Sequence, residues 1–282
     1  MKALINYIIE QKNTKLQQKL YKYTPKTKEE LKQLIKEHIK NEGLKCDLND
    51  IDVSNIKDMS NLFSGYETRY FNGDISNWDV SNVTNMHGMF TYCYEFEGKG
   101  LENWDVSNVT DMKYIFDGCE KLDCDLSNWD ISNLTNMEGM FYCCFNFQGK
   151  GLENWDVSNV KNMREMFYRC EKLDCDLSNW DISNVTDINS MFEGCYNLNC
   201  NLSKWDVSNV INMEYMFYHC IKFEGKGLEN WDVSNVTNMK GMFNNCEKLD
   251  CNLSNWDISN VKEYYHIFYK CPIKDEYKPN FE

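Results

Sequence analysis

The chain has 282 residues, of which 42% are hydrophobic and 26% charged, and its formal net charge is −14 at pH 7. This length is ample for a buried core, and no apolar run approaches the roughly 18 residues of a membrane helix. The acidic balance argues against a nucleic-acid binder, because such proteins present a basic surface to the phosphates. The sequence therefore predicts a folded protein with no membrane span and no nucleic-acid partner.

Residues 1–45 form a basic segment with eleven Lys and five Glu, a net charge of +6. We expect one helix over residues 2–20 and a second one starting near Thr27, where Glu30 completes a capping box. Gly43 is a suitable stop for that second helix. Its apolar stripe consists of Leu31, Leu34, Ile35 and Ile39, with His38 at the border. This stripe predicts a helical N-terminal cap over the core that follows.

The first ten residues lack the uninterrupted apolar run and the cleavage site of a signal peptide. This absence favours a cytoplasmic location, where the fourteen cysteines would be thiols rather than disulfides.

Regularly spaced tryptophans divide the rest of the chain into copies of one repeat. The gaps between successive tryptophans are 25 or 26 residues, and Ile51 holds the equivalent place 27 residues before the first of them. The eight are Trp78, Trp104, Trp129, Trp155, Trp180, Trp205, Trp231 and Trp256. Nine copies from 46 to 271 predict a repeat solenoid, in which each unit buries its apolar face against its neighbours.

Positions within a copy are numbered here from its Trp, or from Ile51 in the first copy. Position −3 is Leu or Ile, positions +2 and +5 are Val, Ile or Leu, position +12 is Phe, and position +15 is Cys in all eight Trp copies. The alternation from −3 to +2 predicts a short strand, and the spacing from +8 to +15 predicts a short helical turn. Stacked strands would then form a parallel sheet.

The string Asn-Trp-Asp-Val-Ser-Asn-Val-Thr-Asn-Met-x-x-Met-Phe-x-x-Cys, complete around Trp78 and Trp231, resembles the repeat of BspA-like bacterial surface proteins. It is similar to the 25–26-residue repeat of mycoplasma lipoproteins and Lactobacillus surface proteins, and to the treponemal leucine-rich repeat. The resemblance covers residues 46–271. It implies a leucine-rich-repeat-like solenoid with a non-enzymatic role, often at the cell surface and in adhesion or host contact.

Every copy carries Asp at +1, Ser at +3 and Asn at +4. We expect a corner in which each Asp accepts turn N–H groups and each Asn bonds between coils. The alternative is a file of carboxylates that binds a divalent cation such as Ca²⁺.

Cysteines occupy two rows, at +15 and at −5, the second with Cys46, Cys124, Cys175, Cys200 and Cys251. Their spacing is a poor match to zinc ligands, so we expect small buried apolar residues and no cofactor, with a metal or redox role as the lesser alternative. A Gly-Lys-Gly segment recurs at 98–100, 149–151 and 225–227. It lacks the rest of a phosphate-binding loop and predicts a turn that absorbs the extra residue of the longer copies.

Function is expected where the copies differ, at positions +9, +10, +13 and +14. Aromatic and basic residues there are His87, Tyr92, Tyr114, Tyr142, Arg164, Tyr168, Arg169, Tyr215, Tyr218, His219, Tyr265, His266 and Tyr269. We select seven as the candidate ridge, namely Tyr142, Arg164, Tyr168, Arg169, Tyr215, Tyr218 and His219, because Tyr and Arg are enriched at binding hot spots.

No catalytic constellation can be assembled from the sequence. We therefore expect a scaffold that binds a protein or glycan, or alternatively an intracellular protein–protein adaptor. Residues 272–282, which begin with Pro272, are expected to form a short C-terminal cap or tail.

Overall fold

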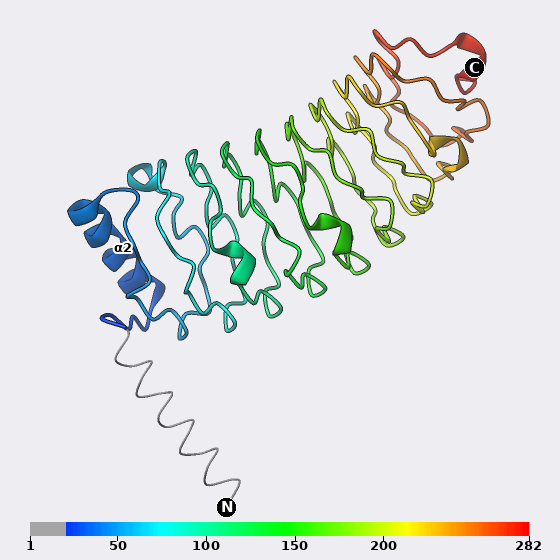
Figure 1. Cartoon of the computed structure of the whole chain (residues 1–282). Helices are drawn as coiled ribbons and strands as arrows, with labels where there is room; N and C mark the ends of the chain where they lie inside the picture. The colour runs from blue at the N-terminus through cyan, green and yellow to red at the C-terminus, as the bar shows by residue number, and fades with distance from the viewer. Residues whose placement is uncertain (1–20, 282) are drawn as a thin grey trace, which may run out of the picture.

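The computed structural model describes residues 21–281, which form an elongated stack of coils with the N-terminal helix at one end (Figure 1). That helix is α2, Lys28–Glu42. Five short 3₁₀ helices follow: η1 (Tyr66–Thr68), η2 (Leu101–Asn103), η3 (Leu152–Asn154), η4 (Leu228–Asn230) and η5 (Asp275–Tyr277). The helix predicted over residues 2–20 lies outside the described part of the chain. No helix within 21–281 is long and apolar enough to cross a bilayer.

Helix α2 confirms the second predicted helix. The Thr27 hydroxyl accepts the Glu30 amide at 3.2 Å, and Gly43 ends the helix with φ +86°. The capping box is incomplete, because the Glu30 carboxylate accepts the amide of Lys26 rather than that of Thr27. Leu31 and Ile35 are buried against the first coil, so the apolar stripe covers the end of the core.

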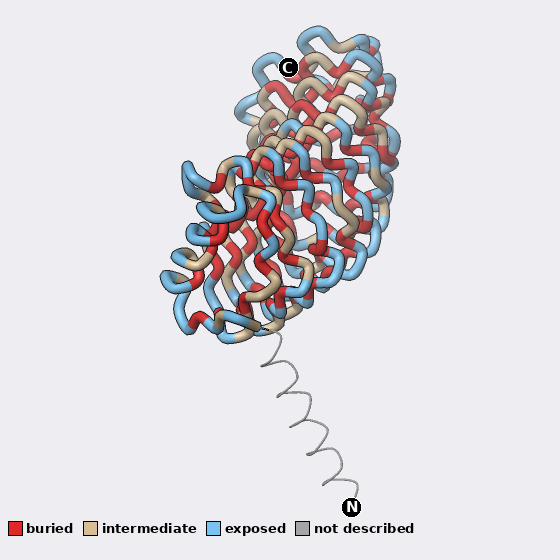
Figure 2. Tube along the Cα trace, turned by 60° about the vertical axis from the view of Figure 1, so that its left-hand side comes forward, coloured by how far each residue is buried: buried red, intermediate tan, exposed pale blue. Residues whose placement is uncertain are grey.

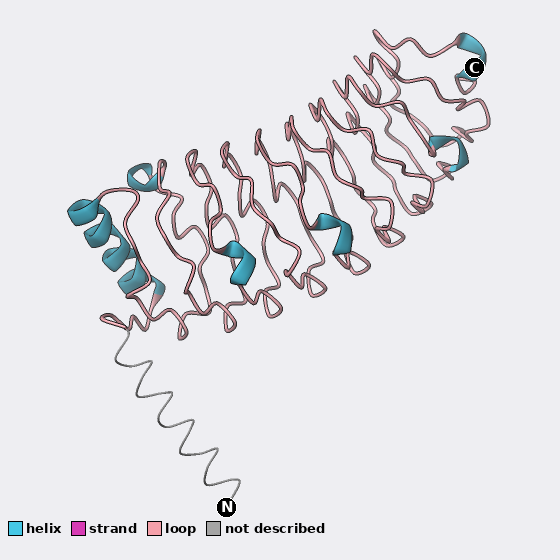
Figure 3. Ribbon diagram, viewed as in Figure 1, coloured by secondary structure: helices cyan, strands magenta, loops and turns pink. Residues whose placement is uncertain are grey.

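The predicted strands are not present in the described residues (Figure 3). Neighbouring coils meet in isolated parallel bridges, mostly at position +7, such as Asn162 with Asp187 and Asp187 with Asn212. The expectation of a short parallel strand around each Trp is therefore wrong. The coils are held together by another hydrogen-bond pattern.

The coil that starts at Trp155 illustrates this pattern. The amides at +8, +10, +12 and +14 donate to carbonyls of the next coil, as in Phe167 to Met191 at 3.0 Å. The amides at +11, +13 and +15 donate back three residues within their own coil, as in Cys170 to Phe167 at 2.9 Å. The +9 amide of Arg164 donates to the side chain at +7. Because alternate amides bond within the coil, no two successive residues pair with a neighbour and no strand propagates.

The predicted helical turn from +8 to +15 is also wrong. Residues at +10 and +14 have left-handed backbone, for example Glu165 at φ 55° and Arg169 at φ 56°, which interrupts any helix. Three of the five 3₁₀ helices occur elsewhere, at the Leu-Glu-Asn that precedes Trp in the three coils with the Gly-Lys-Gly insertion.

The core lies along the axis of the stack, where the same positions are buried in each coil before the last (Figure 2). The Phe residues at +12 stack from coil to coil, with ring centroids 5.6 Å apart for Phe141–Phe167 and 5.7 Å for Phe167–Phe192. Burying one such ring contributes about 1.5–3 kcal/mol, so the repeated apolar positions dominate the stability of the stack.

Candidate functional site

The predicted Asp–Ser bond of the corner is present in all nine copies, and the Asn bond to the preceding coil is present in the eight copies after the first. Asp156, for example, accepts the Ser158 amide at 3.0 Å. Asn159 Nδ2 donates to the carbonyl of Ser132 in the preceding coil at 2.9 Å. The corners therefore close each turn and join neighbouring coils.

These contacts also offset the repulsion along the carboxylate row. The Ser107 hydroxyl and amide lower the pKa of Asp105, and the Ser183 contacts lower that of Asp181 although neighbouring Asp156 raises it. Within residues 21–281, no group of three or more His, Cys, Asp or Glu side chains is arranged to hold a metal ion.

The cysteines at +15 form a ladder of thiol donors. Cys170 Sγ lies 3.1 Å from the Phe141 carbonyl oxygen of the preceding coil, and Cys195 Sγ lies 3.0 Å from that of Phe167. Burial raises the pKa of these thiols well above the usual range. The Phe63 carbonyl of the first copy is contacted by Cys93 Sγ at 3.4 Å and also accepts the Thr68 hydroxyl of its own coil. The position thus takes a buried side chain that can donate a hydrogen bond, not merely a small apolar one.

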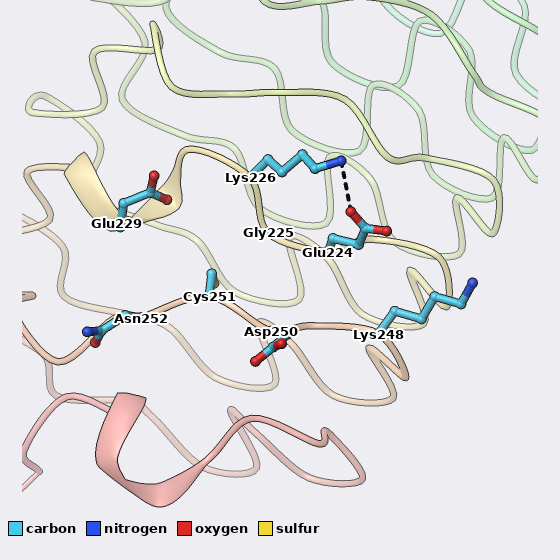
Figure 4. A pocket seen from close by; sticks show the side chains of 8 residues that line it. All are labelled: Glu224, Gly225, Lys226, Glu229, Lys248, Asp250, Cys251 and Asn252. Carbon is cyan, nitrogen blue, oxygen red and sulfur yellow. Dashed lines mark ion pairs between the residues drawn. The ribbon is translucent and has the colours of Figure 1, made fainter.

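The Gly-Lys-Gly segments are wedged between two coils. A Cβ on Gly225 would lie 2.6 Å from Cys251 Sγ of the next coil, and one on Gly227 would lie 2.2 Å from the Ser203 amide nitrogen of the preceding coil. Both glycines have positive φ. Figure 4 shows the hollow beside this segment, about 690 Å³ in volume, with Lys226 paired to Glu224 at 2.9 Å. The segment is a turn that absorbs the extra residue, as predicted.

Four of the seven ridge residues meet around one shallow hollow of about 190 Å³. Its lining consists of Tyr168, Arg169, Glu193, Gly194, Tyr196, Tyr218 and His219. The four come from two coils that are not adjacent, and the coil between them contributes Glu193, Gly194 and Tyr196. Small Gly194 lies between Arg169 and His219 at the same position, +14, and this difference in size makes the hollow.

Glu193, Gly194 and Tyr196 were not predicted from the sequence. Glu193 and Gly194 occupy variable positions but are neither aromatic nor basic, and Tyr196 lies at +16, outside the positions considered. Position +14 is a large residue in one coil, Gly194 in the next and a large residue again in the third. This alternation could have located the hollow from the sequence.

Two of the other three ridge residues pack against residues that line the hollow. Tyr142 stacks on Tyr168 with ring centroids 4.4 Å apart. Tyr215 meets Tyr218 edge-on at 5.4 Å. Arg164 is exposed and its guanidinium pairs with its neighbour Glu165 at 3.0 Å. Tyr142 and Tyr215 thus extend the surface around the hollow, whereas Arg164 pairs with its own neighbour and contacts none of the other six, which all lie within the described residues.

The hollow is electrostatically mixed. Burial raises the pKa of Glu193, while the Ser190 hydroxyl, which donates to its carboxylate at 2.8 Å, acts in the opposite direction. Burial lowers the pKa of His219 and Lys270 lowers it further, which favours the neutral imidazole. Arg169 packs over the Phe145 ring at 5.2 Å, with Glu171 at 3.7 Å. A ligand here would meet one arginine, several tyrosine rings and one carboxyl group.

The most exposed aromatic residues lie towards the two ends of the stack. The ridge tyrosines are half-buried, whereas large exposed side chains include Tyr66, Tyr70, Tyr92, Tyr264, Tyr265 and Tyr269. Exposure therefore does not single out the middle coils; what distinguishes them is the hollow.

Comparisons with known proteins identify a family but no function. No curated protein matches the chain. The crystal structure of a TLR13–ssRNA13 complex matches over 73% of this chain and 39% of that chain, at 11% sequence identity. Its TM-score is 0.24, which is too low to establish a common fold. A family model described as "Mycoplasma protein of unknown function, DUF285" matches residues 11–150, 136–227 and 201–276. The chain is therefore a repeat protein that belongs to this mycoplasma family.

Proposed function

We propose that this protein is a non-enzymatic scaffold, a leucine-rich-repeat-like solenoid related to BspA-like surface proteins, that binds a protein or glycan through the candidate ridge. The observation that carries the proposal is the hollow between Tyr168 and Tyr218. It is built from positions that vary, on a frame whose other positions are nearly constant.

The frame supports a binding role because it fixes the backbone under the ridge. The amide of Arg169 donates to the Glu193 carbonyl at 2.6 Å, and the amide of His219 donates to the Asn244 carbonyl at 2.8 Å. Side chains on such a backbone lose little further freedom on binding, which favours affinity. Tyrosine and arginine supply large contact areas of the kind that dominates binding energy.

The chemistry of the hollow also favours binding over catalysis. Its candidate base, His219, accepts a hydrogen bond at Nε2 from Asn245 Nδ2 at 3.0 Å rather than contacting a hydroxyl or thiol nucleophile. The buried thiols of the +15 ladder have raised pKa values, so their reactive thiolate forms are disfavoured.

The test is a ridge variant made from residues that other copies already tolerate. Thr occurs at +13 and Gly at +14 elsewhere in the chain, so Tyr168→Thr, Arg169→Gly, Tyr218→Thr and His219→Gly should preserve the fold. The matched control, Lys161→Ser with Ile211→Ser, changes exposed residues of the same two coils at +6.

Each protein is applied to a glycan array and to a panel of purified host surface proteins, after circular dichroism has established folding. We expect at least one ligand that the unaltered chain and the control bind and that the ridge variant loses by about a hundredfold or more, since hot-spot residues contribute several kcal/mol together. Equal binding of that ligand by a folded ridge variant would refute the proposal.

Protease treatment of intact source cells, followed by immunoblotting, separates the two settings for this function. Loss of the protein while a cytosolic control survives would support adhesion or host contact. Survival until lysis would support an intracellular adaptor that uses the same ridge.

A further inference from the structure

The first copy departs from the repeat beside the N-terminal cap. Ile51 and Trp78 are 27 residues apart, and the extra length forms η1, which lies next to α2 (Figure 1). Thr68 anchors this insertion, because its hydroxyl accepts the Gly65 amide at 3.0 Å and donates to the Phe63 carbonyl. The insertion is thus a fixed part of the fold.

Arg69 follows directly and has a fixed backbone with an unpaired guanidinium. Its carbonyl accepts the Tyr94 amide at 2.8 Å. Its side chain stacks on Tyr66, 3.9 Å from the ring centroid, and its buried Nε has no hydrogen-bond partner among the described residues. The sequence has two other arginines, Arg164 and Arg169, and both have a carboxylate within 4 Å. In the described part of the chain Arg69 has no such ion pair.

A row of tyrosine rings extends from this guanidinium, beginning with Tyr70, whose ring centroid lies 6.0 Å from it. Tyr66 is 79% exposed and Tyr92 is 52% exposed. Tyr70 and Tyr94 have ring centroids 6.0 Å apart, and Tyr92 lies 6.2 Å from Tyr94. Aromatic rings beside an arginine offer contact area at little cost in conformational entropy.

A basic flank of α2 borders the same surface. Lys28, Lys32, Lys36 and Lys40 recur every four residues and therefore lie along one side of the helix. Lys36 Nζ is 3.3 Å from a Glu67 carboxylate oxygen, which places this flank beside η1. Burial lowers the pKa of Lys32, and the neighbouring Lys28 and Lys36 lower it further. Lys28 is already bound to Asp58 at 2.9 Å, whereas Lys32 has no ion pair within the described residues.

We propose that this cap-end patch, formed by Tyr66, Arg69, Tyr70, Tyr92, Tyr94, Lys32 and Lys36, binds an acidic segment of a partner protein. A carboxylate of the segment accepts hydrogen bonds from the outer nitrogens of Arg69, whose planar group suits a carboxylate. Lys32, which has no ion pair in the described residues, and Lys36, whose exposed pair with Glu67 is weak in water, attract neighbouring acidic residues of the segment, and the tyrosine rings cover its apolar atoms.

Charge complementarity supports this choice of partner. Residues 21–45 have seven Lys and four Glu, a net charge of +3, whereas residues 46–282 carry −20. Acidic ligands are therefore repelled by most of the chain and attracted to this end. The patch is separate from the candidate ridge, so its test is independent of the function proposed above.

The three arginines permit a direct experiment. In a ¹⁵N correlation spectrum of the full chain, the side-chain Nε–H region should contain three signals, and Arg69→Lys identifies one of them. The probe is a capped hexaglutamate peptide, with hexalysine, inorganic phosphate and vesicles of anionic phospholipid as comparisons.

We expect hexaglutamate to shift the Arg69 signal saturably and to leave those of Arg164 and Arg169 in place. The affinity should fall as salt rises from about 50 to 300 mM, because exposed charges are screened. Arg69→Lys, followed through neighbouring amides, should bind about tenfold more weakly, as loss of a charge-assisted hydrogen bond implies. Tyr66→Ala should weaken binding as well, while Lys161→Ser should not.

Three results would overturn the proposal. One is the absence of a shift at Arg69, and another is an equal shift of all three arginine signals. The third is a shift of the Arg69 signal by phosphate or vesicles at concentrations no higher than those of the peptide, which would assign the patch to phosphate groups.

Discussion

The ring of Tyr114 occupies the space in which Gly139 would carry a side chain. A Cβ on Gly139 would lie 2.1 Å from Tyr114 Cε1, and both residues have left-handed backbone at +10 of neighbouring coils. Tyr215 covers Gly241 in the same way. A large residue at +10 of one coil is thus accommodated by a glycine at +10 of the next.

Gly139→Ala should lower the free energy of unfolding by about 1–3 kcal/mol, as overpacking a filled site does. In a Tyr114→Ala background the same change should cost markedly less, because the ring is gone. Urea unfolding of the four proteins in this double-mutant cycle measures the coupling.

Gly194→Ala is the control for the backbone effect. Its tightest contact would be with Cγ of the flexible Arg169 side chain at 3.1 Å, with the Arg169 Cα at 3.4 Å, so the change should be better tolerated. If Gly139→Ala lowered the free energy of unfolding equally with and without the Tyr114 ring, this account would be contradicted.

The thiol donor at Cys170 can be tested with two isosteric replacements. Thr keeps a donor for the Phe141 carbonyl, as Thr68 does for Phe63, whereas Val removes it. Burying an unpaired hydroxyl costs about 1–3 kcal/mol, and a hydrogen bond offsets most of that cost. We therefore expect Cys170→Thr to be at least as stable as Cys170→Val in urea unfolding. A threonine variant less stable than the valine variant by about 2 kcal/mol would mean that the carbonyl needs no donor.

Removing the charge of Asp117 should make the folded state more stable. Burial, with a contribution from Glu165, raises its pKa to about 6, above the value of about 4 in an unfolded chain. The charged form is therefore disfavoured in the folded state. This penalty is absent below about pH 4, grows as the pH rises, and is complete above about pH 6.

Asp117→Asn should accordingly stabilise the protein at pH 7.5 by about 1–2 kcal/mol, after allowance for partial exposure. The gain should vanish at pH 4. Asp105→Asn is the control of opposite sign, because Ser107 lowers the pKa of Asp105 and its charge therefore favours folding at pH 7.5. If Asp117→Asn changed the free energy of unfolding equally at pH 4 and pH 7.5, the raised pKa of Asp117 would be refuted.

Alkylation should distinguish the buried thiols from the half-exposed ones. Only Cys124, Cys143, Cys175 and Cys271 are half-exposed among the described residues. Burial raises the pKa of Cys143 to about 11 and that of Cys124 to about 12, so even these should react slowly at pH 7.5 and faster at higher pH. Iodoacetamide labelling followed by peptide mass spectrometry should leave Cys170 unmodified until urea is added. Rapid labelling of Cys170 in the folded protein would contradict its burial.

Removal of divalent cations should leave the thermal unfolding midpoint unchanged. The corner carboxylates already accept hydrogen bonds from serine, as Asp232 does from the Ser234 amide and hydroxyl. A lower midpoint in EDTA, restored by Ca²⁺, would instead favour the cation file considered from the sequence.

The features that repeat could be predicted from the sequence, whereas the features that depend on left-handed backbone conformation could not. The period, the buried positions and the corner bonds follow from residue identity, because apolar, Asp, Ser and Asn positions recur in every copy. The strands and helical turns were wrong, because residues such as Glu165 and Arg169 have left-handed backbone that their identities do not announce. Non-glycine residues adopt that region only when the surrounding fold compels them.

The candidate ridge also has residues that could be predicted from the sequence and residues that could not. Tyr168, Arg169, Tyr218 and His219 could be selected by residue type, and the structure brings them around one hollow. Glu193 could not, because nothing about a lone acidic residue reveals that it lies between two tyrosines of neighbouring coils. Position within the stack, rather than residue type, assigns it to the site.

The wedged glycines have a consequence for how such an array can grow. Gly98, Gly149 and Gly225 each pack against a cysteine of the following coil, at Cys124, Cys175 and Cys251. A coil with the insertion therefore requires a successor that bears the matching small residue at −5. In these stretches a coil with the insertion and its successor with cysteine at −5 form one structural unit. Gain or loss of only one of the two coils would place the glycine turn against an unsuitable side chain. A coil without the insertion can be added singly, as the coil of Trp205 with Cys200 shows, whereas a coil with the insertion should be gained or lost together with its successor.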